Sequence, residues 1–204
     1  MPNCMKYKPT YILIAINVVV YIYTSILSGN ALVISDPVAK VFGQYNLFVF
    51  DGAYWQLLTS MFVHASIAHI VGNMLFLFIF GLRGEEMFSL PEFLGIYLFG
   101  GLAGNVLSLG FGPDFLSVGA SGAIFALFGA IVIYSRRSVR QSILGALVYA
   151  FFLFFISSGA ENVNILAHLG GLAFGLAVGY LLARSRKPND ELSARRASSA
   201  SLPF

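Results

Sequence analysis

The chain has 204 residues, of which 58% are hydrophobic and only 10% are charged, with a formal net charge of +3. Soluble domains carry about a quarter charged residues, so this composition and a mean hydropathy of +0.81 exclude an ordinary soluble protein. They indicate an integral membrane protein whose length suits one compact, all-α helical bundle. The single cysteine, Cys4, cannot form an internal disulfide.

Six apolar segments along the chain predict six membrane spans. Several are at or below the ~20 residues that a helix needs to cross ~30 Å of hydrocarbon, so we expect them to pack inside a bundle. Lys6 and Lys8 precede the first segment, but no cleavage site follows it, and we expect that helix to be retained. The segments lie at 11–28, 66–82, 93–111, 120–134, 142–157 and 165–183.

Positive charge favours one orientation of these spans. Of the 12 lysines and arginines, only Lys40 falls on the side opposite to the others. The positive-inside rule then predicts cytoplasmic termini in a multi-pass protein of the cell (plasma) membrane. We expect a cytoplasmic segment at 1–9, a six-helix domain at 10–184 and a disordered basic tail at 185–204. The cations on the predicted cytoplasmic side are Lys6, Lys8, Arg83, Arg136, Arg137, Arg140, Arg184, Arg186, Lys187, Arg195 and Arg196.

Polar residues gather where the second, fourth and sixth segments begin. Because these three segments run in the same direction, their first residues share one level in the membrane. The second begins with His64, His69 and Asn73, the fourth with Ser121 and the sixth with His168, which together include all three histidines of the chain. Polar side chains are costly in hydrocarbon and commonly mark functional sites there. This convergence predicts a single site on the outer side.

The residue types at this level suit nucleophilic catalysis. A serine hydroxyl is a weak nucleophile until a base accepts its proton, and histidine is the base best matched to neutral pH. Ser121 lies between Gly119 and Gly122 at a helix start, where free N–H groups can stabilise an oxyanion. His69 and Asn73 are four residues apart on one helical face, and both can donate hydrogen bonds.

The acidic residues are badly placed to complete a triad. Asp114 and Glu161 fall in outer loops and Glu85 falls near the opposite face, so we expect a dyad of Ser121 and His168. A span with the 120–134 boundaries is only ~22 Å long at 1.5 Å per residue. Ser121 would then lie below the outer surface, and hydrolysis would require a water-filled cavity.

Each of these residues also has a structural interpretation. A serine among small residues commonly serves packing or bonds to its own helix, and Asn73 can form an interhelical hydrogen bond. Small residues at Gly171, Gly175 and Gly179 favour close helix packing, which would bring the sixth segment against the fourth. A metal site of the three histidines lacks the His-Glu-x-x-His pattern, so no metal or cofactor is expected.

Four motifs resemble those of the rhomboid family of intramembrane serine proteases. They occur in the family's order, and the resemblance covers about residues 10–184. The motifs are Trp55-Gln56-Leu57-Leu58-Thr59, His64-Ala65-Ser66-Ile67-Ala68-His69-Ile70-Val71-Gly72-Asn73, Gly119-Ala120-Ser121-Gly122 and Ala167-His168-Leu169-Gly170-Gly171.

The resemblance implies specific roles for these residues. Ser121 would be the nucleophile and His168 the general base, with oxyanion stabilisation by His69, Asn73 and the Ser121 backbone N–H. Supporting roles are implied for three further residues: His64 near the rim of the site, Gly119, and Phe125, which would pack on the imidazole. Glu85 is implied to be structural. The chain departs from the family at Gln56, where rhomboids have a loop arginine.

The resemblance also implies partners and leaves two alternatives open. The expected partners are transmembrane protein substrates, cleaved at a small residue, and membrane lipids, with no nucleic acid; nothing in the sequence specifies an oligomeric state. Either the polar loop at 159–164 or the phenylalanine-rich segment at 142–157 could control substrate access. The alternative to a protease is a catalytically silent rhomboid-like protein that binds or escorts membrane proteins.

Overall fold

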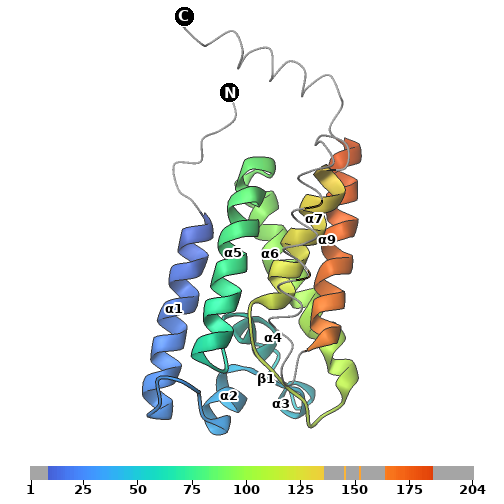
Figure 1. Ribbon diagram of the computed structural model, residues 1–204. Coiled ribbons are helices and arrows are strands. Elements are labelled where there is room, and N and C mark those ends of the chain that lie inside the picture. The colour runs from blue at the N-terminus through green and yellow to red at the C-terminus, as the bar shows by residue number, and fades with distance from the viewer. Residues whose placement is uncertain (1–8, 136–144, 146–151, 153–163, 186–204) are drawn as a thin grey trace, which may run out of the picture.

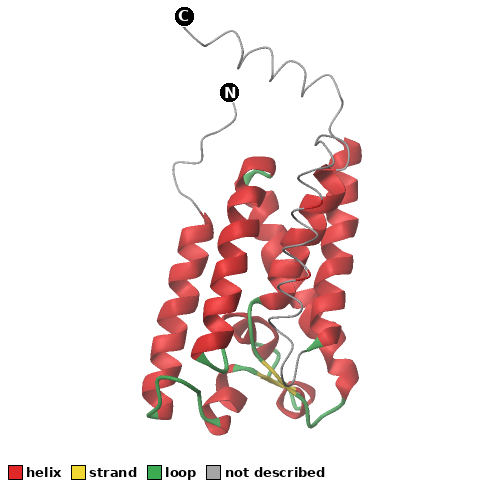
Figure 2. Cartoon of the chain, viewed as in Figure 1, coloured by secondary structure: helices red, strands yellow, loops and turns green. Residues whose placement is uncertain are grey.

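The computed structural model describes residues 9–135, 145, 152 and 164–185. Most of these residues are helical (Figure 2). Among the described residues, four helices are long and apolar enough to cross a membrane, whereas α7 is apolar but has only 15 residues. The apolar helices of the bundle are α1 (Pro9–Ser28), α5 (Ile67–Met87), α6 (Leu90–Ser108), α7 (Ser121–Ser135) and α9 (Ile165–Ser185).

The five helices agree with five of the six predicted segments to within a few residues. The largest differences are at α5, which continues to Met87, and at α6, which begins at Leu90. The carboxylate of Glu92 accepts a hydrogen bond from the Ser89 backbone N–H at 2.7 Å, and this cap starts α6 earlier than hydropathy suggests. The predicted segment at 142–157 lies outside the described residues, except for Gly145 and Phe152. The count of six spans therefore stays a prediction.

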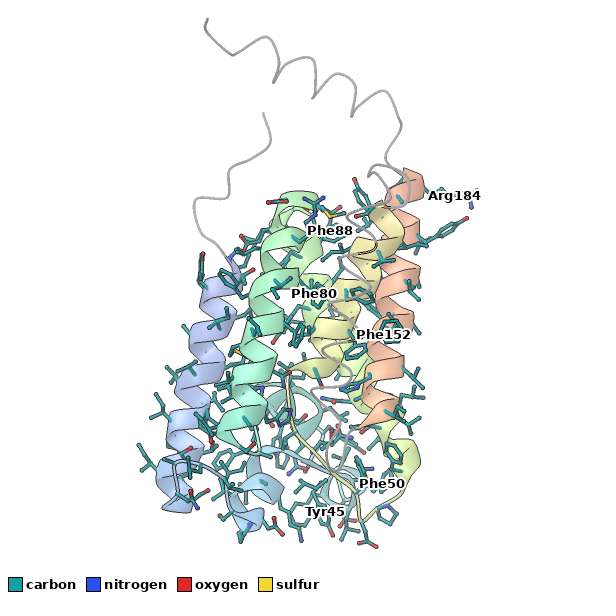
Figure 3. All side chains as sticks on the ribbon, in the orientation of Figure 1. Tyr45, Phe50, Phe80, Phe88, Phe152 and Arg184 are labelled. Atoms are coloured by element: carbon teal, nitrogen blue, oxygen red, sulfur yellow. The ribbon has the colours of Figure 1, made fainter. Side chains whose placement is uncertain are left out.

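Short elements gather at one end of the bundle (Figure 1). Strand β1 (Gln44–Tyr45) pairs antiparallel with β2 (Leu116–Ser117), and Gln44 faces Ser117. Figure 3 shows Tyr45 and Phe50 at this end and Phe88 and Arg184 at the opposite one. The pair of strands ties the long first loop to the segment that leads into α7. The other short elements are α2 (Asp36–Phe42), α3 (Asn46–Phe50), α4 (Gln56–Thr59), the 3-10 helix η1 (Ser60–Phe62) and the 3-10 helix η2 (Leu109–Phe111).

Helix α7 lies at the centre of the bundle, in contact with α5, α6 and α9. Ile124, Leu127 and Ile131 are fully buried. A helix that is apolar all round is stable when neighbouring helices cover it, so its short length does not expose its ends to hydrocarbon. Helix α7 begins further into the bundle than α9 does (Figure 1).

The contact between α7 and α9 depends on glycine. A Cβ atom added at Gly171 or Gly175 would overlap the carbonyl oxygen of Gly122 or Ala126, respectively. The glycines therefore let the two backbones approach directly, as small residues do in membrane helix pairs. The predicted packing of this glycine face of α9 against α7 is confirmed, and it sets the distance between the two helix starts.

Candidate active site

Ser121 and His168 meet where α7 and α9 begin. Ser121 is the first residue of α7, and its Oγ lies 2.8 Å from Nε2 of His168. The two side chains are 9% and 4% exposed, respectively. At this distance the serine hydroxyl can donate a hydrogen bond to an unprotonated Nε2. The geometry is that of a nucleophile beside its base.

The imidazole of His168 stacks on the ring of Phe125. Their centroids are 4.3 Å apart and their planes differ by 12°. Phe125 lies one turn after Ser121 on α7, so the same helix carries the serine and the face against which the histidine rests. This stacking restricts rotation of the imidazole and excludes water from one of its faces.

Asn164 connects the start of α9 with the segment before Ser121. Its Oδ1 accepts a hydrogen bond from the Ala167 backbone N–H at 2.9 Å, which caps the helix. Its Nδ2 donates to Oγ of Ser117 at 2.6 Å, and Ser117 is the β2 residue opposite Gln44. From the sequence we expected Asn164 only as part of the polar loop at 159–164, although an asparagine just before an apolar run is a helix-start signal. The rest of that loop, 159–163, lies outside the described residues.

Gly119 brings the chain close to His69. The φ angle of Gly119 is +124°, and a Cβ atom there would lie 2.9 Å from Cε1 and Nε2 of the His69 ring. Both facts require glycine, because L residues with a side chain rarely adopt this φ and the space is already occupied. The edge of the His69 ring therefore lies against the backbone two residues before Ser121.

Asn73 lies one turn after His69 on α5 and is 2% exposed. Its Nδ2 donates to the backbone carbonyl of His69 at 3.0 Å. An amide nitrogen carries two hydrogens, so this bond to its own helix uses one and leaves the other for a second acceptor. The predicted alternative, a hydrogen bond between helices, is therefore not the bond observed, because Asn73 bonds to its own helix. The oxyanion role of Asn73 stays a prediction.

His64 is fully buried, whereas the family resemblance suggests a place near the rim. Its Nε2 lies 3.5 Å from the Ala120 backbone N–H, at the long limit of a hydrogen bond. Its ring meets that of His69 edge-on at 5.1 Å. The ring of His64 therefore lies between the backbone before Ser121 and the ring of His69.

Gln56 stands where rhomboids have an arginine, and it holds the first loop together. The side chain is 1% exposed. Its Oε1 accepts from the Tyr45 backbone N–H at 3.0 Å, and its Nε2 donates to the carbonyls of Lys40 at 2.7 Å and Val41 at 3.2 Å. A buried amide with three such bonds anchors α4 to β1 and α2, so this departure does not leave the loop unsupported.

Glu85 and Asp114 bond to other parts of the bundle, as the sequence suggested. Glu85 accepts from the Thr10 backbone N–H at 2.7 Å and joins α1 to α5, while Asp114 accepts from the Tyr45 hydroxyl at 3.3 Å. Glu161 falls outside the described residues. Within the ranges that the structure covers, no three His, Cys, Asp or Glu side chains are grouped in a way that could hold a metal ion.

The apolar helices and the buried serine–histidine pair define a class: a multi-pass helical membrane protein with the arrangement of a serine hydrolase. The sequence model of the Rhomboid domain matches residues 51–185. The chain belongs to the rhomboid family.

Individual relatives agree with this assignment. YdcA of Bacillus subtilis, named as a candidate rhomboid protease, is 31% identical over 189 residues, which cover 89% of this chain and 92% of YdcA. Rhomboid protease GluP of the same organism is 33% identical over 82% of this chain but only 34% of its own length. The mitochondrial RHOMBOID-like protein 6 of Arabidopsis thaliana is 38% identical over 63% of this chain and 43% of its own length. The chain thus spans less than half of the latter two proteins.

Proposed function

We propose that this rhomboid is an intramembrane serine endopeptidase that acts through a dyad of Ser121 and His168. The observation that carries the proposal is the 2.8 Å contact between Oγ and Nε2 inside a helical membrane bundle. His168 accepts the proton as Ser121 attacks the carbonyl carbon of a peptide bond, and then gives it to the departing amine. Water, deprotonated by the same imidazole, hydrolyses the acyl-enzyme.

The oxyanion of the tetrahedral intermediate faces donors from two helices. The backbone N–H of Ser121 is at the start of α7, where N–H groups have no partner within the helix. His69 and Asn73 supply side-chain donors from α5, and the close approach of the His69 ring to Gly119 at 2.9 Å supports this role. Donors fixed in a site with little water stabilise developing charge more strongly than water does.

The proposed substrate is a transmembrane segment of another membrane protein. In hydrocarbon a helix pairs all its backbone groups, so the segment must unwind before Ser121 reaches a carbonyl, and small or helix-breaking residues favour this step. We further propose six spans with both termini in the cytoplasm of the cell and the site opening on the outer side. A silent escort protein is less well supported, because this chain retains serine and histidine at bonding distance.

Cleavage in reconstituted vesicles tests this function. Wild-type protein and the Ser121→Ala variant would be incorporated with a single-span substrate that has small residues near its outer end. We expect wild type to release two fragments cut within or beside the span, with no effect of a chelator, and the variant to release none. A wild-type protein that retains the uncut substrate during purification would instead support the escort function.

A further inference from the structure

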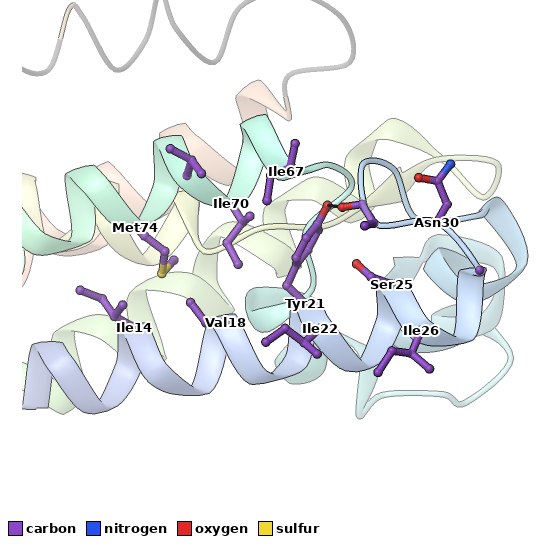
Figure 4. Close-up of a pocket in the computed structure, with 13 residues that line it drawn as sticks. Ile14, Val18, Tyr21, Ile22, Ser25, Ile26, Asn30, Ile67, Ile70 and Met74 are labelled. Atoms are coloured by element: carbon purple, nitrogen blue, oxygen red, sulfur yellow. Dashed lines mark hydrogen bonds between the residues drawn. The ribbon is translucent and has the colours of Figure 1, made fainter.

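A lateral groove of about 700 Å³ lies between α1 and α5, away from the serine–histidine pair. Its walls are α1 from Ile14 to Ile26 and α5 from Ile67 to Met74, and the turn at 29–31 closes one end (Figure 4). The lining is apolar except at that end, where Ser25 and Asn30 lie. We call this space the α1/α5 groove.

The α1/α5 groove opens sideways from the bundle. Its floor is buried, with Tyr21 at 5% and Ile70 at 4% exposure, whereas its rim residues Ile26 and Val71 are 72% and 60% exposed. The Tyr21 hydroxyl donates to the carbonyl of Ala31 at 3.0 Å, so this polar group is satisfied by protein. Because α1 and α5 are both membrane-spanning candidates, the opening faces hydrocarbon.

The length and volume of the groove match one lipid chain. The stretch from Ile14 to Ile26 rises ~18 Å along α1 at 1.5 Å per residue, close to the ~15 Å of one leaflet in a ~30 Å core. Since a methylene group is about as large as a water molecule, ~30 Å³, the groove has room for about 20 of them. A partner helix would cross both leaflets, but the groove ends at Met74 while α5 continues to Met87.

Polarity changes along the groove in the way that it changes along a phospholipid. The amide oxygen of Asn30 accepts from the backbone N–H groups of Leu32 at 2.8 Å and Val33 at 3.3 Å, which shapes the turn at the groove's end. The hydroxyl of Ser25 is buried beside it and has no hydrogen-bond partner in the part of the chain that the structure describes. The exposed side-chain amide of Asn30 has an N–H₂ group that can donate to an ester carbonyl at this end of the groove.

We propose that the α1/α5 groove binds one acyl chain of a glycerophospholipid, with the ester region at Ser25 and Asn30. The lipid comes from the leaflet that surrounds the end of the bundle where β1 and β2 lie. The bound chain packs on α5 beside the turn that carries His69. Binding rests on the groove alone and does not depend on the proposed protease activity.

Photo-crosslinking with matched tryptophan variants tests this site. Val18 lines the groove, while its neighbour Val19 does not and is 65% exposed. Wild type, Val18→Trp and Val19→Trp would be placed in bilayers containing a phosphatidylglycerol that carries a diazirine within one acyl chain. We expect the adducts of wild type and Val19→Trp to concentrate on the groove lining. In Val18→Trp the yield there should fall about tenfold, the change that 1.4 kcal/mol makes in binding.

A second variant and four outcomes make the test decisive. Val71→Trp fills the groove from the α5 wall and should lower the yield in the same way, which guards against misfolding of one variant. Adducts spread evenly over all lipid-facing helices, or unchanged in both filled variants, would overturn the proposal. It would also be overturned by chain-to-chain crosslinks through the groove, or by a transmembrane peptide that displaces the lipid adducts.

Discussion

Gly119 and Phe125 lie close to Ser121 in the chain, one before it and one after it, and both shape the surroundings of the proposed dyad. The positive φ of Gly119 turns the chain against the His69 ring, and Phe125 stacks on the His168 ring. Both residues lie in the same short stretch of chain as the nucleophile. Small local changes there should therefore alter the geometry of the site before they alter the stability of the bundle.

Asn73 offers a direct test of the oxyanion assignment at the residue scale. Asn73→Ala removes a side-chain donor next to His69, and loss of one such donor lowers turnover by about a hundredfold or more. We expect a lower kcat for a transmembrane substrate with KM little changed and the thermal unfolding temperature in detergent nearly that of wild type. Turnover equal to that of wild type would remove Asn73 from the oxyanion site.

Substitutions at Asn164 and Ser117 test whether the hydrogen bond between these side chains holds the start of α9 against the segment that leads into α7. Ser117→Ala removes the 2.6 Å contact but keeps the helix cap, whereas Asn164→Ala removes both. A buried hydrogen bond contributes about 1 kcal/mol and a cap about 1 kcal/mol more. We expect both variants to lower kcat, and Asn164→Ala to lower the unfolding temperature further.

The conservative variant Asn164→Asp is the control for this pair. A carboxylate can cap α9 and accept a hydrogen bond from the Ser117 hydroxyl, so activity close to wild type is expected. If Asn164→Asp were as impaired as Asn164→Ala, or if Ser117→Ala had wild-type kcat, the connection between the strand and α9 would not position the dyad.

At the scale of elements, the crossing of α7 and α9 depends on the absence of side chains at Gly175. Gly175→Ala places a Cβ atom against the carbonyl of Ala126, so the helices must separate and Oγ of Ser121 must move from His168. Overpacking of this kind costs about 1–3 kcal/mol. We expect a lower unfolding temperature and a loss of activity larger than the loss of folded protein explains.

Gly72→Ala is the matched control, because a Cβ atom at Gly72, also within a membrane helix, would meet nothing within 4 Å. Alanine is favoured over glycine in a helix by about 0.5–1 kcal/mol, so this variant should be at least as stable as wild type. Equal effects of the two substitutions would contradict the role given to close packing of α7 and α9.

Hydropathy predicted the long helices well because a membrane span is a local property of the sequence. It missed β1 and β2, which are two residues each and owe their pairing to contacts between segments far apart in the chain. It also missed the hydrogen bonds of Gln56, because a glutamine's partners depend on how α2 and β1 fold around it.

The sequence could predict that the site residues lie at the same depth in the membrane, but not that they are in contact. These residues are Ser121, His168, His69 and Asn73. The level followed from the direction of the spans, and the glycines of α9 indicated which helices would touch. The 2.8 Å contact and the bond from Asn164 to Ser117 depend on tertiary packing. The burial of His64 likewise follows from the fold, since its position in the sequence suggested only proximity to the site.

At the scale of the whole molecule, the bundle surrounds a short central helix whose first residue is Ser121. Helices α5, α6 and α9 cover α7, so the short helix is stable inside the bundle and its first residue lies further in than the start of α9 (Figure 1). The short elements between α1 and α5 lie at the same end as the starts of α5 and α9 (Figure 1). The fold thus brings a polar site to one side of a largely apolar molecule.

The central claim is that His168 activates Ser121 as a nucleophile, and covalent labelling measures this directly. The purified protein in detergent would be treated with a fluorophosphonate probe, alongside Ser121→Ala and His168→Ala. We expect wild type to be labelled on Ser121, with or without a chelator, and neither variant to be labelled above background. Labelling of Ser121→Ala equal to that of wild type would contradict it.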